Sequence, residues 1–158
     1  MGIEFKKVSE FNRGILVELL TDAYSFNTEI EKECSAKWLE NDSFFFDNLQ
    51  IADKYCIITT LNDEAIGFVA WDPRNMPEYV EIGDNCIVSK HKGNGYGKLQ
   101  LQEAINRITE NDVKKIIVTT NSDLISAQRN YESVGFKVYQ RRKAEGFIGD
   151  YIDYVYFL

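Results

Sequence analysis

Three closely spaced glycines, at positions 93, 95 and 97, constrain this chain more than any other feature of its sequence. They lie between a predicted strand, YVEIGDNCIV at 79–88, and an amphipathic helix predicted over 97–110. At such a junction, the unpaired N–H groups of the first helical turn and the positive end of the helix dipole form an anion site. Glycine lets a phosphate come close because no Cβ intervenes. The segment therefore predicts a phosphate-binding turn, with a purely structural sharp turn as the alternative.

Two common nucleotide-binding motifs do not fit this turn. The mononucleotide pattern GxxxxGK[ST] needs glycine where the chain has Lys92, and serine or threonine where it has Leu99. The dinucleotide pattern GxGxxG fits Gly93 and Gly95, but its third glycine falls on Lys98. A nucleotide-binding domain is therefore disfavoured.

The hydrophobic pattern elsewhere predicts a mixed α/β chain in the order β-α-α-β-β-β-α-β-α-β-β. A turn at NDE, 62–64, joins two strands as a hairpin, and Gly83 indicates a bulge or a close approach within its strand. Ser9 and Asn12 lie in a predicted cap region of the first helix. The expected strands are 3–8, 54–61, 65–72, 79–88, 114–121, 136–143 and 150–158, and the expected helices are 10–24, 29–48, 97–110 and one along the stripe from Leu124 to Val134.

Size, charge and cysteine content narrow the class of protein. A chain of 158 residues suits one domain. A net charge of −7 argues against nucleic acid as a partner and is compatible with a cationic amine ligand. Three scattered cysteines with one histidine predict neither a metal site nor a disulfide framework. Because no long apolar segment occurs, we expect no membrane association and a cytoplasmic location.

Two segments together resemble the motifs of the GNAT N-acetyltransferase superfamily. IVSKHKGNGYGKLQLQ is similar to that family's V-x-P-x-x-[RQ]-G-x-G-x-[GA], with Ser89 at the proline position and Lys92 at the Arg/Gln position. AQRNYESVGF is similar to its A-x-x-[LF]-Y-x-x-x-GF, with Tyr131 and Gly135 in register. The resemblance implies a single N-acetyltransferase domain over residues 1–158. Its implied fold is a mixed, mostly antiparallel sheet of about six to seven strands, with a splayed central pair and flanking helices.

The same resemblance implies acetyl-CoA as co-substrate, with no metal. In the family, loop amides, here Gly93 to Lys98, hold the pyrophosphate, and the main chain of the preceding strand end pairs with the pantetheine arm. Asn121 or Ser126 would replace a family asparagine, because that position is Leu124 here. The implied cofactor-binding residues are Asn85, Cys86, Ile87, Val88, Ser89, Lys92, Gly93, Asn94, Gly95, Tyr96, Gly97, Lys98, Asn121 and Tyr131.

The implied reaction transfers the acetyl group directly to a primary amine of a small molecule or peptide, without an acyl-enzyme. Tyr131 matches the family's tyrosine acid, and a phenol with a pKa of about 10 is a suitable proton donor to a departing thiolate. Glu81 is the candidate general base, because alternation along its strand puts it on the same face as Asn85 and Ile87. Its carboxylate could therefore reach the cleft that holds acetyl-CoA in the family. Asp84 would face the other way unless a bulge at Gly83 re-aims it, and the strand at 114–121 offers only Thr119 and Thr120.

Alternatives to this assignment stay open. The same fold could serve as a non-catalytic acyl-CoA-binding or sensing domain that has lost productive chemistry. Cys86 has no histidine partner and is expected to be a small core residue, and YQRR at 139–142 is expected to be a solvated strand edge. The aromatic segment DYVYFL at 153–158 is a candidate homodimer contact, as in relatives. Sequence leaves the acceptor amine unidentified.

Overall fold

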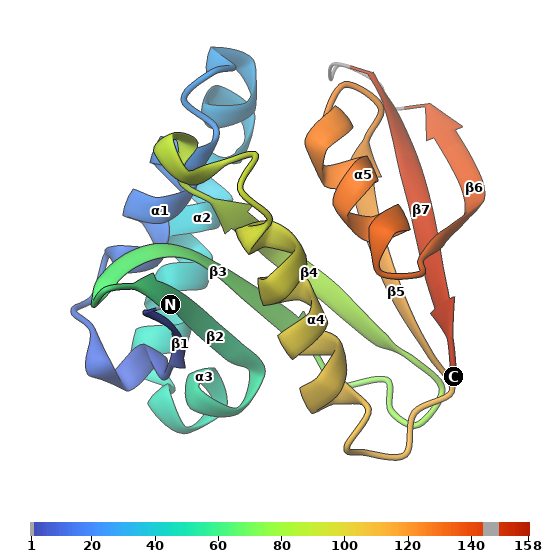
Figure 1. The fold of residues 1–158 in the computed structure, drawn as a ribbon, viewed down its shortest axis with the longest axis horizontal. Coiled ribbons are helices and arrows are strands. Elements are labelled where there is room, and N and C mark those ends of the chain that lie inside the picture. The colour runs from blue at the N-terminus through green and yellow to red at the C-terminus, as the bar shows by residue number, and fades with distance from the viewer. Residues whose placement is uncertain (1, 144–148) are drawn as a thin grey trace. The chain divides into compact units, whose positions relative to one another are not determined.

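The computed structural model describes residues 2–143 and 149–158 and shows a mixed α/β fold (Figure 1). Within these residues, the strands form one sheet in the order β1-β2-β3-β4-β5-β7-β6. All of its described strand pairs are antiparallel except that between β4 and β5. The predicted fold class is therefore confirmed. The strands are β1 (Ile3–Lys6), β2 (Cys56–Leu61), β3 (Glu64–Asp72), β4 (Val80–Ile87), β5 (Lys115–Asn121), β6 (Lys137–Lys143) and β7 (Asp150–Phe157), and the helices are α1 (Ile15–Ala23), α2 (Thr28–Asp47), α3 (Leu49–Tyr55), α4 (Tyr96–Ile108) and α5 (Ile125–Ser133).

The chain divides into two compact units, and the boundaries cut through β3, β4 and α4. The first unit comprises the residues up to Ala70 together with Asp84–Gln100, and the second comprises Trp71–Gly83 together with Leu101–Leu158. The glycine turn therefore belongs to the first unit, whereas Glu81 and Tyr131 belong to the second. None of the helices in the described residues is long and apolar enough to cross a membrane.

The first unit is built on the β2–β3 hairpin. Asn62 and Asp63 form its turn with φ of 50° and 69°, the left-handed values that a two-residue hairpin turn of this kind requires. The predicted hairpin is therefore confirmed. Burial does not alternate along β2, where the first five residues are all buried, as expected for a strand that is covered on both faces.

Helix α1 begins later than the sequence predicted. The expected start near residue 10 is a short 3-10 turn over Val8–Glu10, and the α-helix starts only at Ile15. Gly14 precedes it with φ of 102°, a left-handed conformation that interrupts any helix coming from residue 10. Neither Ser9 nor Asn12 caps the helix, because Asp42 of α2 accepts hydrogen bonds from the N–H groups of Gly14 and Leu16 at 3.0 and 3.1 Å.

The sequence also missed helix α3. Asn48 ends α2 and directly precedes α3, which occupies residues assigned to no element and part of the segment predicted as strand 54–61. Its only buried residue is Ala52, so a helix of seven residues presents almost no apolar period to detect.

In the second unit, α5 packs against the sheet strands β5 and β7 (Figure 1). The ring of Tyr131 lies 5.7 Å from those of both Phe136 and Tyr154, centroid to centroid. The parallel ladder of β4 and β5 pairs Val80–Ile82 with Ile116–Val118, although both strands continue further.

Candidate active site

The glycine turn has the backbone geometry expected of a ligand-binding loop. Gly93 and Gly95 have φ of 80° and 84°, which side-chain-bearing residues rarely adopt. A Cβ at either position would meet no atom within 4 Å, so the requirement for glycine there is conformational rather than steric. The first hydrogen bond of α4 runs from the Leu99 N–H to the Gly95 carbonyl. The amides of Tyr96, Gly97 and Lys98 therefore form the open first turn of the helix.

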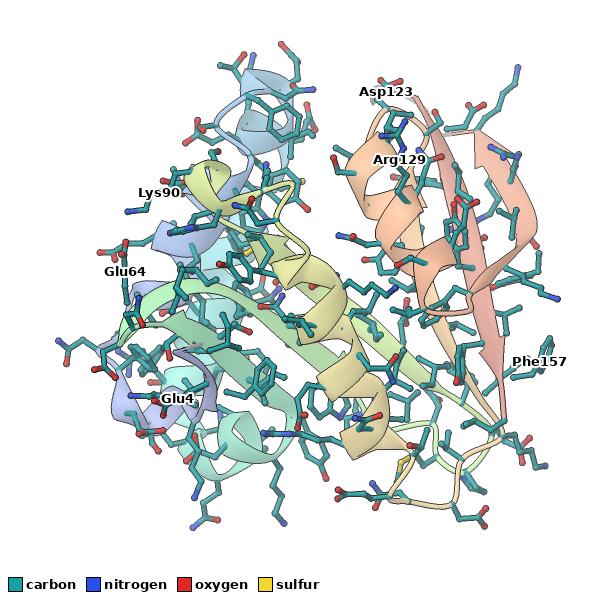
Figure 2. The ribbon with its side chains drawn as sticks, viewed as in Figure 1. Glu4, Glu64, Lys90, Asp123, Arg129 and Phe157 are labelled. Carbon is teal, nitrogen blue, oxygen red and sulfur yellow. The ribbon has the colours of Figure 1, made fainter. Side chains whose placement is uncertain are left out.

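The residues around this turn are tied locally. Asn94 donates its side-chain amide to the His91 carbonyl at 3.5 Å, and the Tyr96 ring lies edge-on to the His91 ring at 6.0 Å. Lys90 pairs with Glu64 at 2.8 Å, on an exposed edge of the unit (Figure 2). The His91 and Tyr96 rings therefore lie beside the loop, whereas the Lys90 ammonium is held at Glu64.

The Lys92 side chain points toward α1. Its ammonium donates to the Ala23 carbonyl and lies 4.5 Å from the ring centroid of Phe26. Burial lowers the pKa of Lys92, while the nearby Asp22 carboxylate raises it by a smaller amount. The main chain of Lys92 is part of the loop, whereas its charge is used at the end of α1.

At the end of β4, the main-chain N–H and C=O groups of successive residues point alternately toward β3 and away from it. Val88 donates its N–H to the Ile66 carbonyl of β3 at 2.8 Å. Adjacent residues of a strand direct their main-chain groups to opposite sides, so those of Ile87 point away from β3. Cys86 is buried, and burial raises the pKa of its thiol, which keeps it protonated as expected for a core cysteine. Ser89 gives its N–H to the Asp22 carboxylate at 2.7 Å.

A buried amide anchors α4 to the strands of the first unit. Gln100 is fully buried, and its side-chain nitrogen lies within 3.1 Å of the Phe68 carbonyl, the Asn85 side-chain oxygen and the Cys86 carbonyl. Its oxygen accepts from the Thr59 hydroxyl at 2.7 Å. Gly67 leaves the room for this arrangement, because a Cβ there would collide with the Cys86 carbonyl oxygen. Sequence reasoning did not identify Gln100, since a glutamine on a helix pattern predicts an exposed face.

In the second unit, Tyr131 is buried on α5 among aromatic rings. Its carbonyl accepts the Phe136 N–H at 3.0 Å, and 4% of the residue is exposed. Asn121, at the end of β5, accepts the Asp123 N–H on its side-chain oxygen at 2.8 Å and so closes the turn into α5. That oxygen therefore shapes the turn, and Leu124 directly precedes the helix as its N-terminal flanking residue.

Glu81 lies on β4 opposite Ile117 of β5. Glu81 is exposed, yet burial of part of its side chain raises its pKa, as do the negative charges of Asp72 and Asp153. The Arg142 guanidinium opposes this increase. A carboxylate with a raised pKa is a stronger base than an ordinary glutamate, so the environment of Glu81 suits proton abstraction.

A network around Asp153 was missed by sequence reasoning. Arg142, in the predicted solvated edge strand, binds the Asp153 carboxylate through two nitrogens at 2.7 and 2.9 Å, and the Thr119 hydroxyl donates to it at 2.6 Å. The three residues come from β6, β7 and β5. The facing of Thr119 and Asp153 depends on strand register, which no local pattern in the chain reveals.

Asp84, the alternative carboxylate, belongs to the first unit. It accepts a hydrogen bond from the Asn41 amide of α2 at 3.2 Å. Burial raises its pKa, while the Asn41 bond and the Lys37 charge act in the opposite direction. The structure thus associates Asp84 with α2 and Glu81 with the Asp153 network.

Comparison with known proteins identifies the class. The model of the acetyltransferase (GNAT) family matches residues 16–136, and the chain belongs to this family. The match spans residues of both units, including the glycine turn and Tyr131. No curated protein matches the chain in sequence.

Solved structures share the fold at low sequence identity. YncA of Salmonella typhimurium, solved with its cofactor acetyl-CoA, has a TM-score of 0.80 and 14% identity, covering 100% of this chain and 95% of that one. A chain of the NatC complex bound to Gag peptide and CoA has a TM-score of 0.73 and 19% identity, covering 100% and 99%. An acetyltransferase of Streptococcus agalactiae has a TM-score of 0.71 and 22% identity, also covering 100% and 99%.

Proposed function

We propose that this protein is an acetyl-CoA-dependent N-acetyltransferase that transfers the acetyl group directly to a primary amine. The observation that carries the proposal is the glycine turn, in which two left-handed glycines precede the open amides at the start of α4. Because the family model covers residues of both units, we also propose that residues 1–158 form a single N-acetyltransferase domain.

In this proposal, acetyl-CoA is held mainly by the protein main chain. The amides from Gly93 to Lys98 bind the diphosphate, which suits them because they carry no competing intrahelical bond. The strand end from Asn85 to Ser89 contacts the pantetheine arm. The main-chain groups of Ile87, directed away from β3, provide donors and acceptors for such an added strand.

The chemistry requires one base and one acid. Glu81 takes a proton from the acceptor ammonium, and the amine nitrogen then attacks the thioester carbonyl carbon. The nitrogen of the tetrahedral intermediate loses its remaining extra proton to solvent, the C–S bond breaks as the intermediate collapses, and the Tyr131 hydroxyl gives its proton to the departing sulfur. Solvent then takes the proton from Glu81 and reprotonates the Tyr131 phenolate. The products are the amide and CoA thiol. The raised pKa of Glu81 supports its role, because it brings the base closer to the amine in proton affinity.

The first experiment tests binding. Calorimetry should show CoA binding to the protein, while NAD and ATP at the same concentrations give no comparable heat. A panel of amines incubated with acetyl-CoA, with released thiol followed by a thiol reagent, then tests transfer and identifies the acceptor. Binding of NAD in preference to CoA would contradict the proposal.

The alternative, a non-catalytic acyl-CoA-binding domain, would bind CoA and release no thiol from acetyl-CoA with any amine of the panel. If thiol is released, Tyr131→Phe tests the proposed acid. The phenylalanine keeps the ring contacts with Phe136 and Tyr154, so we expect unchanged CoA affinity and a kcat lowered by about 10²-fold. Tyr154→Phe is the matched control, because that hydroxyl donates to Glu132 at 2.9 Å and has no proposed part in the reaction. Equal kcat values for Tyr131→Phe and wild type would remove Tyr131 from the mechanism.

Two further expectations stay proposals. A cytoplasmic location is supported by Cys34, Cys56 and Cys86, which are free thiols in the structure. A homodimer through the C-terminal strand is supported by Phe157, which is 73% exposed and projects from the end of β7 (Figure 2).

A further inference from the structure

Residues 89–92, which lead into the glycine turn, are fastened to the C-terminal end of α1. Asp22 accepts the Ser89 N–H on its carboxylate at 2.7 Å and the Ser89 hydroxyl on its main-chain carbonyl at 2.8 Å. Lys92 donates to the Ala23 carbonyl and lies over the Phe26 ring. All of these residues belong to the first unit. We call this set, Asp22, Ala23, Phe26, Ser89 and Lys92, the α1 latch.

The Asp22–Ser89 pair fixes the backbone at a defined point. A charge-assisted bond from a main-chain N–H to a carboxylate is stronger and shorter than a neutral one. The Ser89 hydroxyl bond gives the same pair of residues a second point of contact. A proline at position 89 would restrict the same stretch of backbone in another way. Proline fixes φ through its ring and has no N–H to donate. In this chain, the hydrogen bond from the Ser89 N–H to Asp22 restricts the backbone at position 89, as the ring of a proline would do covalently.

The Lys92 ammonium contacts the end of α1 and is therefore not placed to bind a phosphate. Its ammonium lies at the carbonyl of the last residue of α1, where the helix dipole is negative. The Phe26 ring, at 4.5 Å, adds a cation–π contact. If the Lys92 ammonium moved to an anion, both contacts would break. Lys92 therefore connects the loop to α1.

We propose that Asp22 and Lys92 are positioning residues that hold the glycine turn in its donor-binding geometry, with the Lys92 ammonium kept at the end of α1. The inference rests on the proposed function, since it concerns how that site is built. It predicts a specific signature. Loosening the latch weakens binding only for donors that carry a diphosphate.

The test compares two ligands by calorimetry, CoA and pantetheine, which lacks the nucleotide diphosphate. For Asp22→Ala, we expect the Kd for CoA to rise about 10-fold, while the Kd for pantetheine stays within about 2-fold of wild type. Lys92→Met keeps the alkyl chain over Phe26 and should show the same ligand selectivity. Lys90→Ala is the control, because Lys90 pairs with Glu64 outside the latch and should leave both constants unchanged.

A second variant tests the mechanism by rescue. Val88 is extended, with φ of −60° and ψ of 151°, as a residue before proline must be. Ser89→Pro in the Asp22→Ala background should therefore restore CoA affinity to within about 2-fold of wild type, because the ring replaces the lost bond. Thermal unfolding confirms that each variant is folded. If Asp22→Ala is not folded, Asp22→Asn, which keeps an acceptor oxygen, replaces it in the same measurements.

Three results would overturn the inference. These are an unchanged CoA affinity in Asp22→Ala, an equal loss for both ligands, or a loss that the proline variant does not restore. Each leaves the proposed function standing if wild type binds CoA. Failure of wild type to bind CoA overturns the proposed function itself, and the two failures are therefore distinguishable.

Discussion

Two carboxylates, Asp84 and Asp153, have pKa values shifted in opposite directions by their surroundings. Burial raises the pKa of Asp84. The Arg142 guanidinium, aided by the Thr119 hydroxyl, lowers that of Asp153 against an opposing effect of burial. The folded state therefore binds a proton on Asp84 more tightly than the unfolded state does, and one on Asp153 less tightly.

The shift of Asp84 predicts how stability depends on pH. As pH rises from the unfolded pKa, about 3.9, through the raised folded pKa, Asp84 lowers the free energy of unfolding. Asp84→Asn removes that cost and keeps an acceptor for Asn41. We expect its unfolding midpoint to exceed that of wild type by about 2 °C at pH 7, with the difference vanishing near pH 3.

Asp153→Asn, the comparison variant, should change the unfolding midpoint in the opposite direction. Asp153→Asn loses its charge-assisted bonds, so its midpoint should fall at pH 7 and approach that of wild type as pH drops through the low folded pKa of Asp153. Thermal unfolding followed by circular dichroism at several pH values measures both. A stabilising Asp84→Asn effect that persists undiminished at pH 3 would contradict the titration argument.

Single residues also show what the sequence could reveal about the site. The need for glycine at 93 and 95 follows from spacing before a helix, and both have the left-handed backbone. The direction of the Lys92 side chain does not follow, because it depends on a helix end some 70 residues earlier. Asp22 carries no local signal, since an acid near a helix C-terminus is unremarkable until Ser89 is placed beside it.

At the scale of elements, the start of α1 depends on a side chain from another helix. Asp42 is buried and takes two main-chain N–H groups of α1. Its removal leaves both donors without that acceptor, so Asp42→Ala should lower the free energy of unfolding by about 2 kcal/mol. Urea denaturation measures the change.

A second aspartate of α2 serves as its control. Asp47 pairs with Arg13 at 2.7 Å, but both side chains are more than half exposed. Exposed pairs contribute about 0.2–1 kcal/mol, so Asp47→Ala should change stability far less than Asp42→Ala. If the two variants lost equal stability, the capping role of Asp42 would be wrong.

Elements with a clear period could be predicted, and those without one could not. Helix α4 was predicted over 97–110 and spans Tyr96–Ile108, and strand β5 was predicted over 114–121 and spans Lys115–Asn121. Both follow their apolar patterns closely. Helix α3 has a single buried residue and was missed. The start of α1 was misplaced because its cap comes from outside the segment.

At the scale of the whole molecule, donor binding should raise thermal stability if it occurs only in the folded state. At a CoA concentration 100 times the Kd, the linkage contribution is about 2.7 kcal/mol. For a chain of 158 residues this corresponds to a rise of about 5–10 °C in the unfolding midpoint. Differential scanning fluorimetry measures the shift, with NAD at equal concentration as the control. No shift with saturating CoA would contradict the proposed donor site.

The burial of Gln100 has a consequence for the kinetics of ligand capture. One side chain fixes the beginning of α4 to β2, β3 and β4, so the helix that presents the loop amides is already locked in place before any ligand arrives. Shifting it would cost several buried hydrogen bonds at once. Association with CoA should then appear in stopped-flow records as a single bimolecular phase, with an observed rate that rises linearly with ligand concentration.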